Sequence, residues 1–262
     1  MRTAILVTLN ETRKGLLITW SYKFNNVAEF VGIGFWFVGI ALLMGSGELE
    51  SPRLPSMLLG FLTWYYAAIA IGNMSFGLSE ETTTGTLEQM YLSPSPTWVI
   101  FLGRVVSTLV VSTVFVAIVG VGLMLIFSIR LPLELRALPV FALTMVGLFG
   151  LGYAVAGATL VFKRVQHFAW VITDALLFVN GAMLPVEHLP DWLESVSKWL
   201  PTTQGIIVMR EIVLEGQSLG AVVADGGLAI LTAQSATYLV AGWVIFRYSE
   251  RIAKRRGTLG QY

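Results

Sequence analysis

The chain has 262 residues, of which 55% are hydrophobic and only 13% are charged. Soluble domains carry about 25% charged residues, and a mean hydropathy of +0.74 is too apolar for a water-exposed surface, so the composition predicts an integral membrane protein. The net charge of +1 favours no nucleic-acid partner, and the lack of cysteine excludes disulfides and thiolate chemistry.

Residues 3–22 are expected to form a helix that lies in the membrane interface. Leu6, Leu9, Leu16 and Trp20 fall near one helical face, and three charged residues fall on another. This pattern is typical of an amphipathic interfacial helix. A frayed cytoplasmic leader is the alternative interpretation.

The whole chain, 1–262, is predicted to be one all-α transmembrane domain with six spans. About 20 apolar residues are needed to cross a hydrocarbon core of about 30 Å. Each such segment must be a helix, because lipid offers no hydrogen-bond partner to the backbone and a helix satisfies its own backbone groups. The six stretches that qualify are 27–45, 55–77, 97–129, 138–162, 166–184 and 222–246.

Positive charges predict the orientation, because Lys and Arg gather in cytoplasmic loops. Six spans place both termini on one side, and 12 of the 17 Lys and Arg residues fall there against 5 on the other side. Both termini, including the basic tail 247–262, are therefore expected in the cytoplasm. The 12 are Arg2, Arg13, Lys14, Lys23, Arg104, Lys163, Arg164, Arg247, Arg251, Lys254, Arg255 and Arg256; the 5 are Arg53, Arg130, Arg136, Lys198 and Arg210.

The polar segment 80–94 lies between the second and third spans and contains no Lys or Arg. Thr84 is a plausible helix cap, and Glu88 is an acid in the first turn, where carboxylates are favourable. Leu87, Met90 and Tyr91 would form an apolar ridge before Pro94 ends the helix. The residues fit a short cytoplasmic helix that docks on a partner, and they also fit an ordinary connecting loop.

The segment 185–215 between the fifth and sixth spans is predicted to be one or two short helices, broken by prolines, that re-enter the outer leaflet. Trp192 and Trp199 suit the membrane interface. His188 stands near three acids, and we interpret this group as a solvated rim, so no metal ligand is assigned.

The sequence "EETTTGTLEQMYLSP" resembles the coupling-helix signature of ATP-binding-cassette permeases of the type-2 exporter family (ABC-2). Thr83 departs from the signature, since the family usually has an acid there. The segment 185–215 is similar to the family's outer-side segment. The coupling positions are Glu81, Gly85, Thr86, Leu87, Glu88 and Pro94, and the outer positions are Pro185, Leu189, Pro190, Trp192, Leu193, Leu200, Pro201 and Arg210.

The resemblance implies a permease that forms half of a pore in a prokaryotic inner membrane. It implies a second permease copy, in a homodimer. It also implies two ATPase subunits that bind the coupling helix, where Met90 would add contact area. None of the five lysines follows a glycine, so the phosphate-binding Gly-x-x-x-x-Gly-Lys-Ser/Thr motif is missing. We therefore expect no enzyme activity or cofactor in this chain, with ATP and Mg²⁺ bound by the partner, and export of a drug, lipid or lipid-linked glycan.

Four residues are candidates for the substrate pathway: Asp174, Asn180, Glu29 and Trp36. Asp174 is either a substrate or gating contact, or a buried polar group bonded to a neighbouring helix, because intramembrane carboxylates avoid lipid. Glu29 is expected to reach the interface or to pair with Lys23. The aromatic runs 35–37 and 64–66 line a passage, or they pack or anchor in lipid.

Two other functions fit the same residues. A proton- or ion-coupled secondary transporter would use Asp174 and Glu29 as its ionisable groups. A membrane scaffold without transport is the third interpretation. No catalytic set of side chains appears in the sequence, so an intramembrane enzyme has no support.

Overall fold

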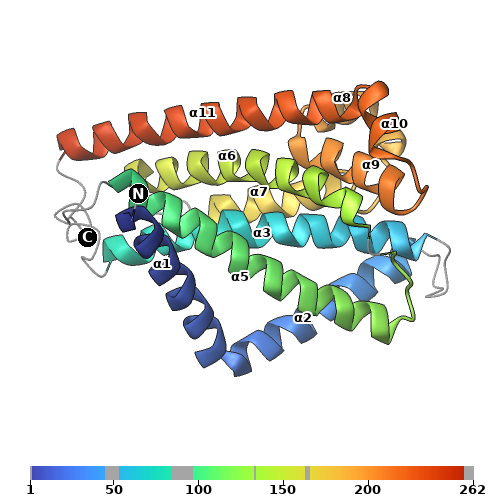
Figure 1. Ribbon diagram of the computed structural model, residues 1–262, viewed down its shortest axis with the longest axis horizontal. Helices are drawn as coiled ribbons and strands as arrows, with labels where there is room; N and C mark the ends of the chain where they lie inside the picture. The colour runs from blue at the N-terminus through green and yellow to red at the C-terminus, as the bar shows by residue number, and fades with distance from the viewer. Residues whose placement is uncertain (1, 45–52, 84–96, 133, 163–165, 257–262) are drawn as a thin grey trace.

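A computed structural model describes residues 2–44, 53–83, 97–132, 134–162 and 166–256, which form a bundle of α-helices (Figure 1). Two short 3-10 turns, Leu135–Ala137 and Val186–His188, precede α6 and α8. The described residues contain no strand, so the predicted all-α class is confirmed. The helices are α1 (Arg2–Ser21), α2 (Lys23–Met44), α3 (Leu54–Thr83), α5 (Thr97–Ile126), α6 (Leu138–Phe162), α7 (Gln166–Val179), α8 (Asp191–Ser197), α9 (Pro201–Val213), α10 (Leu219–Ala224) and α11 (Gly227–Arg256).

Five stretches of helix in the described residues are long and apolar enough to cross a membrane. They correspond to five of the six predicted spans and support a polytopic membrane protein. They are Lys23–Leu43, Leu54–Asn73, Gly103–Ile126, Leu135–Phe162 and Gly227–Arg255.

The remaining predicted span, 166–184, is helical only as far as Val179. Helix α7 has 14 residues, which corresponds to about 21 Å at 1.5 Å per residue. The chain then turns: Gly181 has φ of +77°, and the Asn180 Oδ1 accepts a hydrogen bond from the Ala182 N–H at 3.0 Å. The sequence prediction was too long here because residues 180–184 are apolar enough to pass for helix.

The last span also differs from its predicted bounds of 222–246. A break at Asp225–Gly226, where Gly226 has φ of +79°, separates α10 from α11, so the long helix starts at Gly227. It continues to Arg256, into the predicted tail. Glu250 lies 2.8 Å from the Lys254 Nζ and 3.8 Å from an Arg247 nitrogen, and such i,i+3 and i,i+4 pairs support a helix.

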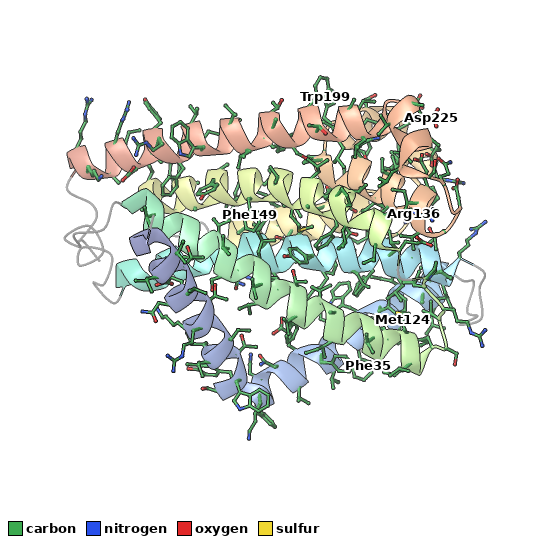
Figure 2. The ribbon with its side chains drawn as sticks, viewed as in Figure 1. Phe35, Met124, Arg136, Phe149, Trp199 and Asp225 are labelled. Atoms are coloured by element: carbon green, nitrogen blue, oxygen red, sulfur yellow. The ribbon has the colours of Figure 1, made fainter. Side chains whose placement is uncertain are left out.

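The two ends of the bundle carry different segments (Figure 1). The start of α1, the end of α3, the start of α5 and the end of α11 lie at one end, and α8, α9 and α10 lie at the other. Arg136, Trp199 and Asp225 mark the second end in Figure 2. The described part of the chain therefore begins and ends on the same side of the bundle, in keeping with the arrangement predicted from the charges.

Helices α6 and α11 pack backbone to backbone. A Cβ atom on Gly242 would overlap the carbonyl oxygen of Gly150, and a Cβ on Gly150 would overlap the backbone of Tyr238. A Cβ on Gly157 would lie 3.0 Å from the Cα of Phe246. The small residues of the fourth span thus serve close helix packing, as they do in many membrane bundles.

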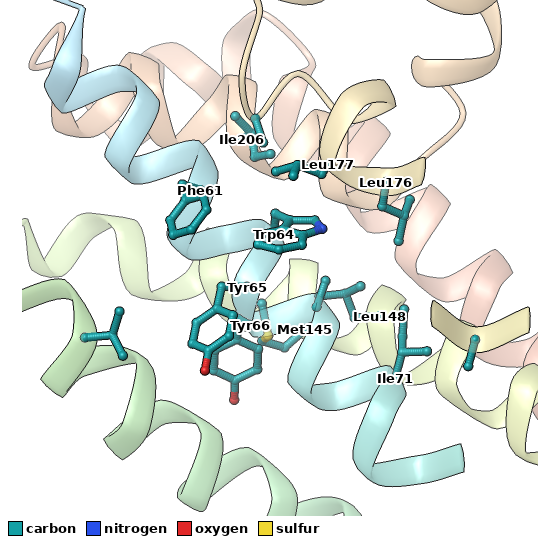
Figure 3. Close-up of a cluster of buried hydrophobic side chains, with 14 of the residues drawn as sticks. Phe61, Trp64, Tyr65, Tyr66, Ile71, Met145, Leu148, Leu176, Leu177 and Ile206 are labelled. Carbon is teal, nitrogen blue, oxygen red and sulfur yellow. The ribbon is translucent and has the colours of Figure 1, made fainter. Parts of the chain in front are cut away.

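Helix α3 is the central element of the core. Its apolar stretch is 72% buried, against 17% for the stretches in α2 and in α11. Phe61, Trp64 and Tyr66 lie within the buried cluster of Figure 3, together with side chains from α6, α7 and α9. Trp64, Tyr65 and Tyr66 are therefore core residues rather than lipid anchors.

Helix α1 crosses the first half of α5 and forms a V with α2 (Figure 1). Gly15 faces Ser107, whose Oγ donates a hydrogen bond to the Glu11 carbonyl oxygen at 2.9 Å. The predicted apolar face is turned away from the protein, since Leu6 and Trp20 are both exposed. The helix is present as predicted, and its place in the membrane interface stays a prediction.

Candidate functional site

The predicted coupling segment falls almost entirely outside the described residues. Glu81 belongs to the last turn of α3 by its backbone. The described helices on either side, α3 and α5, reach the same end of the bundle (Figure 1). The other coupling positions lie in the stretch 84–96, which the structure does not describe: Gly85, Thr86, Leu87, Glu88, Met90 and Pro94.

The depth of the predicted pathway residues can be measured against α3. Trp64 lies near the middle of the apolar stretch Leu54–Asn73, about 15 Å from either end at 1.5 Å per residue. Its Nε1–H donates a hydrogen bond to the Thr173 carbonyl oxygen at 2.7 Å. This bond holds α7 against α3, and it sets Asp174, the next residue, near the middle of the span.

Asp174 occupies the face of α7 that is turned away from the bundle. Its side chain is exposed, whereas Thr173, Leu176 and Leu177 are buried against the core. In the part of the chain that the structure describes, the Asp174 carboxylate has no hydrogen-bond or salt-bridge partner. A charged side chain at the centre of a bilayer costs about 2.5–3.5 kcal/mol on insertion scales, so this face is unsuited to plain contact with lipid.

Glu29 is held on the opposite flank of α3. The Tyr65 hydroxyl donates a hydrogen bond to the Glu29 Oε1 at 2.8 Å, and Tyr65 follows Trp64 in α3. The Glu29 carboxylate therefore bonds to a residue near the α3 midpoint, instead of reaching the interface or pairing with Lys23 as expected. The two intramembrane carboxylates are at similar depth, and they are separated by α3.

The other two predicted pathway residues, Asn180 and Trp36, do not lie beside Asp174 or Glu29. Asn180 is fully buried in the turn after α7, where its Oδ1 accepts from the Ala182 N–H. Trp36 is exposed on α2, about two helical turns beyond Glu29. Asn180 thus supports a turn through its Oδ1, its role in a pathway stays a prediction, and Asp174 stands alone on its face among the four.

Arg210 is a half-buried cation at the end of the bundle that carries α8 to α10. From α9 its Nη2 donates hydrogen bonds to the carbonyl oxygens of Ser56 at 3.2 Å and Ala182 at 3.3 Å. Burial lowers the pKa of its guanidinium from 12.5 to about 10, and the Glu187 carboxylate acts in the opposite direction. Arg210 therefore ties the start of α3, the turn after α7 and α9 together as a charged group.

Comparison with known proteins decides the family. The family model described as "ABC-2 type transporter" matches residues 9–214. The chain belongs to this family. The matched region contains both sequence segments that carried the resemblance, 80–94 and most of 185–215.

Individual relatives of this ABC-2 family member match over shorter stretches. The chain is 31% identical over 150 residues to "Probable multidrug ABC transporter permease YbhR" of Escherichia coli K12, covering 55% of this chain and 40% of the relative. It is 31% identical over 80 residues to "Nodulation protein J" of Rhizobium leguminosarum bv. trifolii, covering 30% of each. The aligned part is thus less than half the length of these curated relatives.

Sequence reasoning about the ABC-2 chain did not single out Arg210 as a central contact. The available signal was one arginine inside the apolar run "GIIVMREIV", which indicates a buried charge when its neighbours are helical and apolar. Its acceptors are backbone carbonyls from two distant segments, and no side-chain pattern marks those. The contact of Trp64 with α7 could not be predicted either, because its acceptor is also a backbone carbonyl, that of Thr173.

Proposed function

We propose that this chain is the membrane-spanning permease subunit of an ATP-driven exporter that moves a hydrophobic or amphipathic substrate out of a prokaryotic cell. The supporting observation is the family match over residues 9–214. The name of the YbhR relative, a probable multidrug permease, agrees with a drug-like or lipid-like cargo. The cargo would pass between two copies of the chain.

The energy would come from a separate ATPase. The chain lacks the glycine-lysine pair of a phosphate-binding loop, so ATP and Mg²⁺ would bind to two copies of a partner subunit. The partner would grip the segment from Glu81 to Pro94, and its closure would bias a bundle with two conformations. In this proposal both termini and the 80–94 segment face the cytoplasm, and the outer helices α8 to α10 face away from it.

The proposal is tested with the double variant Gly85→Pro and Leu87→Asp. A proline and a buried charge should destroy a short docking helix, while the spans stay inserted. We expect the tagged chain, purified from its native membranes, to retain an ATPase subunit only in wild-type form. Inverted membrane vesicles should accumulate the dyes Nile red or rhodamine 6G with ATP in the wild type and lose this accumulation in the variant.

The matched control is Ser93→Ala with Ser95→Ala, two changes on either side of Pro94 and outside the coupling positions. This control should keep both the ATPase subunit and the ATP-driven accumulation. Unchanged transport in the Gly85→Pro, Leu87→Asp variant would contradict the coupling role. Accumulation by the purified chain under a proton gradient without any ATPase would favour the secondary transporter instead.

A further inference from the structure

The open face of α7 combines one carboxylate with large apolar side chains. Val171, three residues before Asp174, is 63% exposed, and Phe178, four residues after it, is 57% exposed. Trp170 stands four residues before Asp174 and is 55% exposed. Residues three and four apart share a helix surface, so Asp174 lies between apolar and aromatic side chains on one continuous face.

This face lies deep in the membrane. The bond from Trp64 to the Thr173 carbonyl oxygen, 2.7 Å long, ties this part of α7 to the middle of the apolar stretch of α3. A carboxylate at this depth is unfavourable against lipid, and such groups face a partner or a wet cavity. The α7 face therefore has an occupant other than lipid tails.

The membrane helices themselves offer no positive charge at this depth. The apolar stretches of α2 after Lys23, α5 after Arg104 and α11 before Arg247 contain neither Lys nor Arg, and the same holds for the stretch Leu54–Asn73 and for α6. A second copy that covered the face with its own α7 would bring another carboxylate and no counter-charge. Two like charges in a desolvated site are repulsive, so a second copy that contributes its own α7 supplies no counter-charge to the carboxylate.

We infer that this outward face of α7 binds a cationic, amphipathic cargo of the exporter. The cation would meet the Asp174 carboxylate, and the ring of Phe178 would add apolar contact and cation–π attraction. The apolar body of the cargo would lie along the same face, over Val171. This inference rests on the proposed function, because it names the class of substrate that the exporter would carry.

Binding to the permease chain alone tests the inference without any ATPase. The full chain is placed in nanodiscs of zwitterionic phosphatidylcholine, and binding of cationic rhodamine 6G and neutral Nile red is measured by fluorescence polarisation. The Asp174→Asn variant should weaken rhodamine 6G binding about tenfold or more, because a desolvated charge pair is lost. Nile red binding should change less than about twofold, and Asp174→Glu should restore cation binding.

The matched control is Asp225→Asn, which removes an exposed carboxylate from the turn between α10 and α11 and should leave both dyes bound as in the wild type. Equal rhodamine 6G binding by wild type and Asp174→Asn, including no binding by either, overturns the inference. An equal loss of both dyes in Asp174→Asn also overturns it, since that is a structural effect. So does a change of oligomeric state in Asp174→Asn with no selective loss of the cation, because the occupant is then a second copy.

Failure of the proposed function has a different signature. If the wild-type chain binds rhodamine 6G through Asp174 but inverted vesicles with the ATPase accumulate neither dye, the exporter function is wrong and the binding site stands. If Nile red is accumulated with ATP and Asp174 has no effect on cation binding, the exporter function stands and the inference falls.

Discussion

Single residues of this chain place charge in two contrasting environments. Arg210 is half-buried, and its Nη2 donates hydrogen bonds to the backbone carbonyls of Ser56 and Ala182, whereas Asp174 lies on an open helix face. An enclosed charge with several hydrogen bonds stabilises the segments it joins, because its acceptors lose their partner when it is removed. An open charge inside a membrane instead indicates contact with something outside the protomer.

The Arg210→Ala variant should lower the free energy of unfolding by about 1–3 kcal/mol, since charged hydrogen bonds and buried side-chain volume are lost together. Thermal unfolding of the purified chain in detergent measures the change. Arg136→Ala is the control, because Arg136 is 58% exposed and lies 3.8 Å from Glu134, and surface pairs contribute about 0–1 kcal/mol. Equal stability of the two variants would argue against a stabilising role of the Arg210 hydrogen bonds.

The same arginine has a defined pH signature. Its pKa of about 10 in the folded chain lies below the ordinary value of 12.5, so the unfolded chain binds more protons between these two values. The stability due to Arg210 should therefore rise with pH from about 10 to 12.5 and stay flat below about 10, where both states are protonated. Thermal unfolding of the wild type and of Arg210→Ala across this range checks the sign. A wild-type advantage that shrinks as the pH rises would contradict it.

At the level of the helices, glycine sets how closely α6 and α11 approach. Gly150 and Gly242 bring the two backbones into contact, and no larger residue fits there without a shift of the helices. Packing of this kind replaces the hydrophobic effect in a membrane, because lipid tails are as apolar as the side chains. The α6–α11 pair is therefore held by direct contact between its two backbones.

Gly242→Ala should destabilise the chain by about 1–3 kcal/mol, because a methyl group would overlap the Gly150 backbone. Gly32→Ala in α2 is the matched control: no atom lies within 4 Å of its new Cβ, and Ala is favoured over Gly in a helix by about 1 kcal/mol. Thermal unfolding in detergent is the measurement. A Gly242→Ala chain as stable as the Gly32→Ala chain would show that the helices separate without loss.

For the molecule as a whole, the two ends of the bundle have different chemistry. The end of α11 carries Arg247, Arg251, Lys254 and Arg255. The other end carries the short helices α8 to α10, where two tryptophans of the segment 185–215 are exposed. Lys and Arg concentrate on the cytoplasmic side of membrane proteins. This asymmetry supports the proposal that the basic end faces the ATPase.

The orientation can be tested by labelling, since the chain has no cysteine of its own. In intact cells a membrane-impermeant maleimide should label Glu215→Cys, which lies in the exposed turn before α10. It should label Arg255→Cys, at the end of α11, only after the membrane is permeabilised. Labelling of Arg255→Cys in intact cells would reverse the orientation, and labelling of both would exclude a sealed membrane span between them.

The class, the family and most of the spans of this protein could be predicted from the amino-acid pattern alone. Apolar stretches of about 20 residues have one structure available in lipid, and the segments 80–94 and 185–215 are local patterns that need no knowledge of packing. The predicted bounds failed where a turn is built from apolar residues, at 180–184, and where two glycines interrupt a long apolar stretch, at Gly226 and Gly227.

Which face of each helix is enclosed could be learned only from the packing of the helices in three dimensions. Asp174 and Asn180 look alike in the sequence as polar residues of one span, yet Asn180 supports a buried turn and Asp174 stands on the open face of α7. In a soluble protein a polar stripe marks the exposed side of a helix. In a membrane both sides of a helix are apolar, so the sequence does not mark the enclosed side. Helix packing alone determines the burial of Trp64, the contact of Glu29 with α3 and the hydrogen bonds of Arg210.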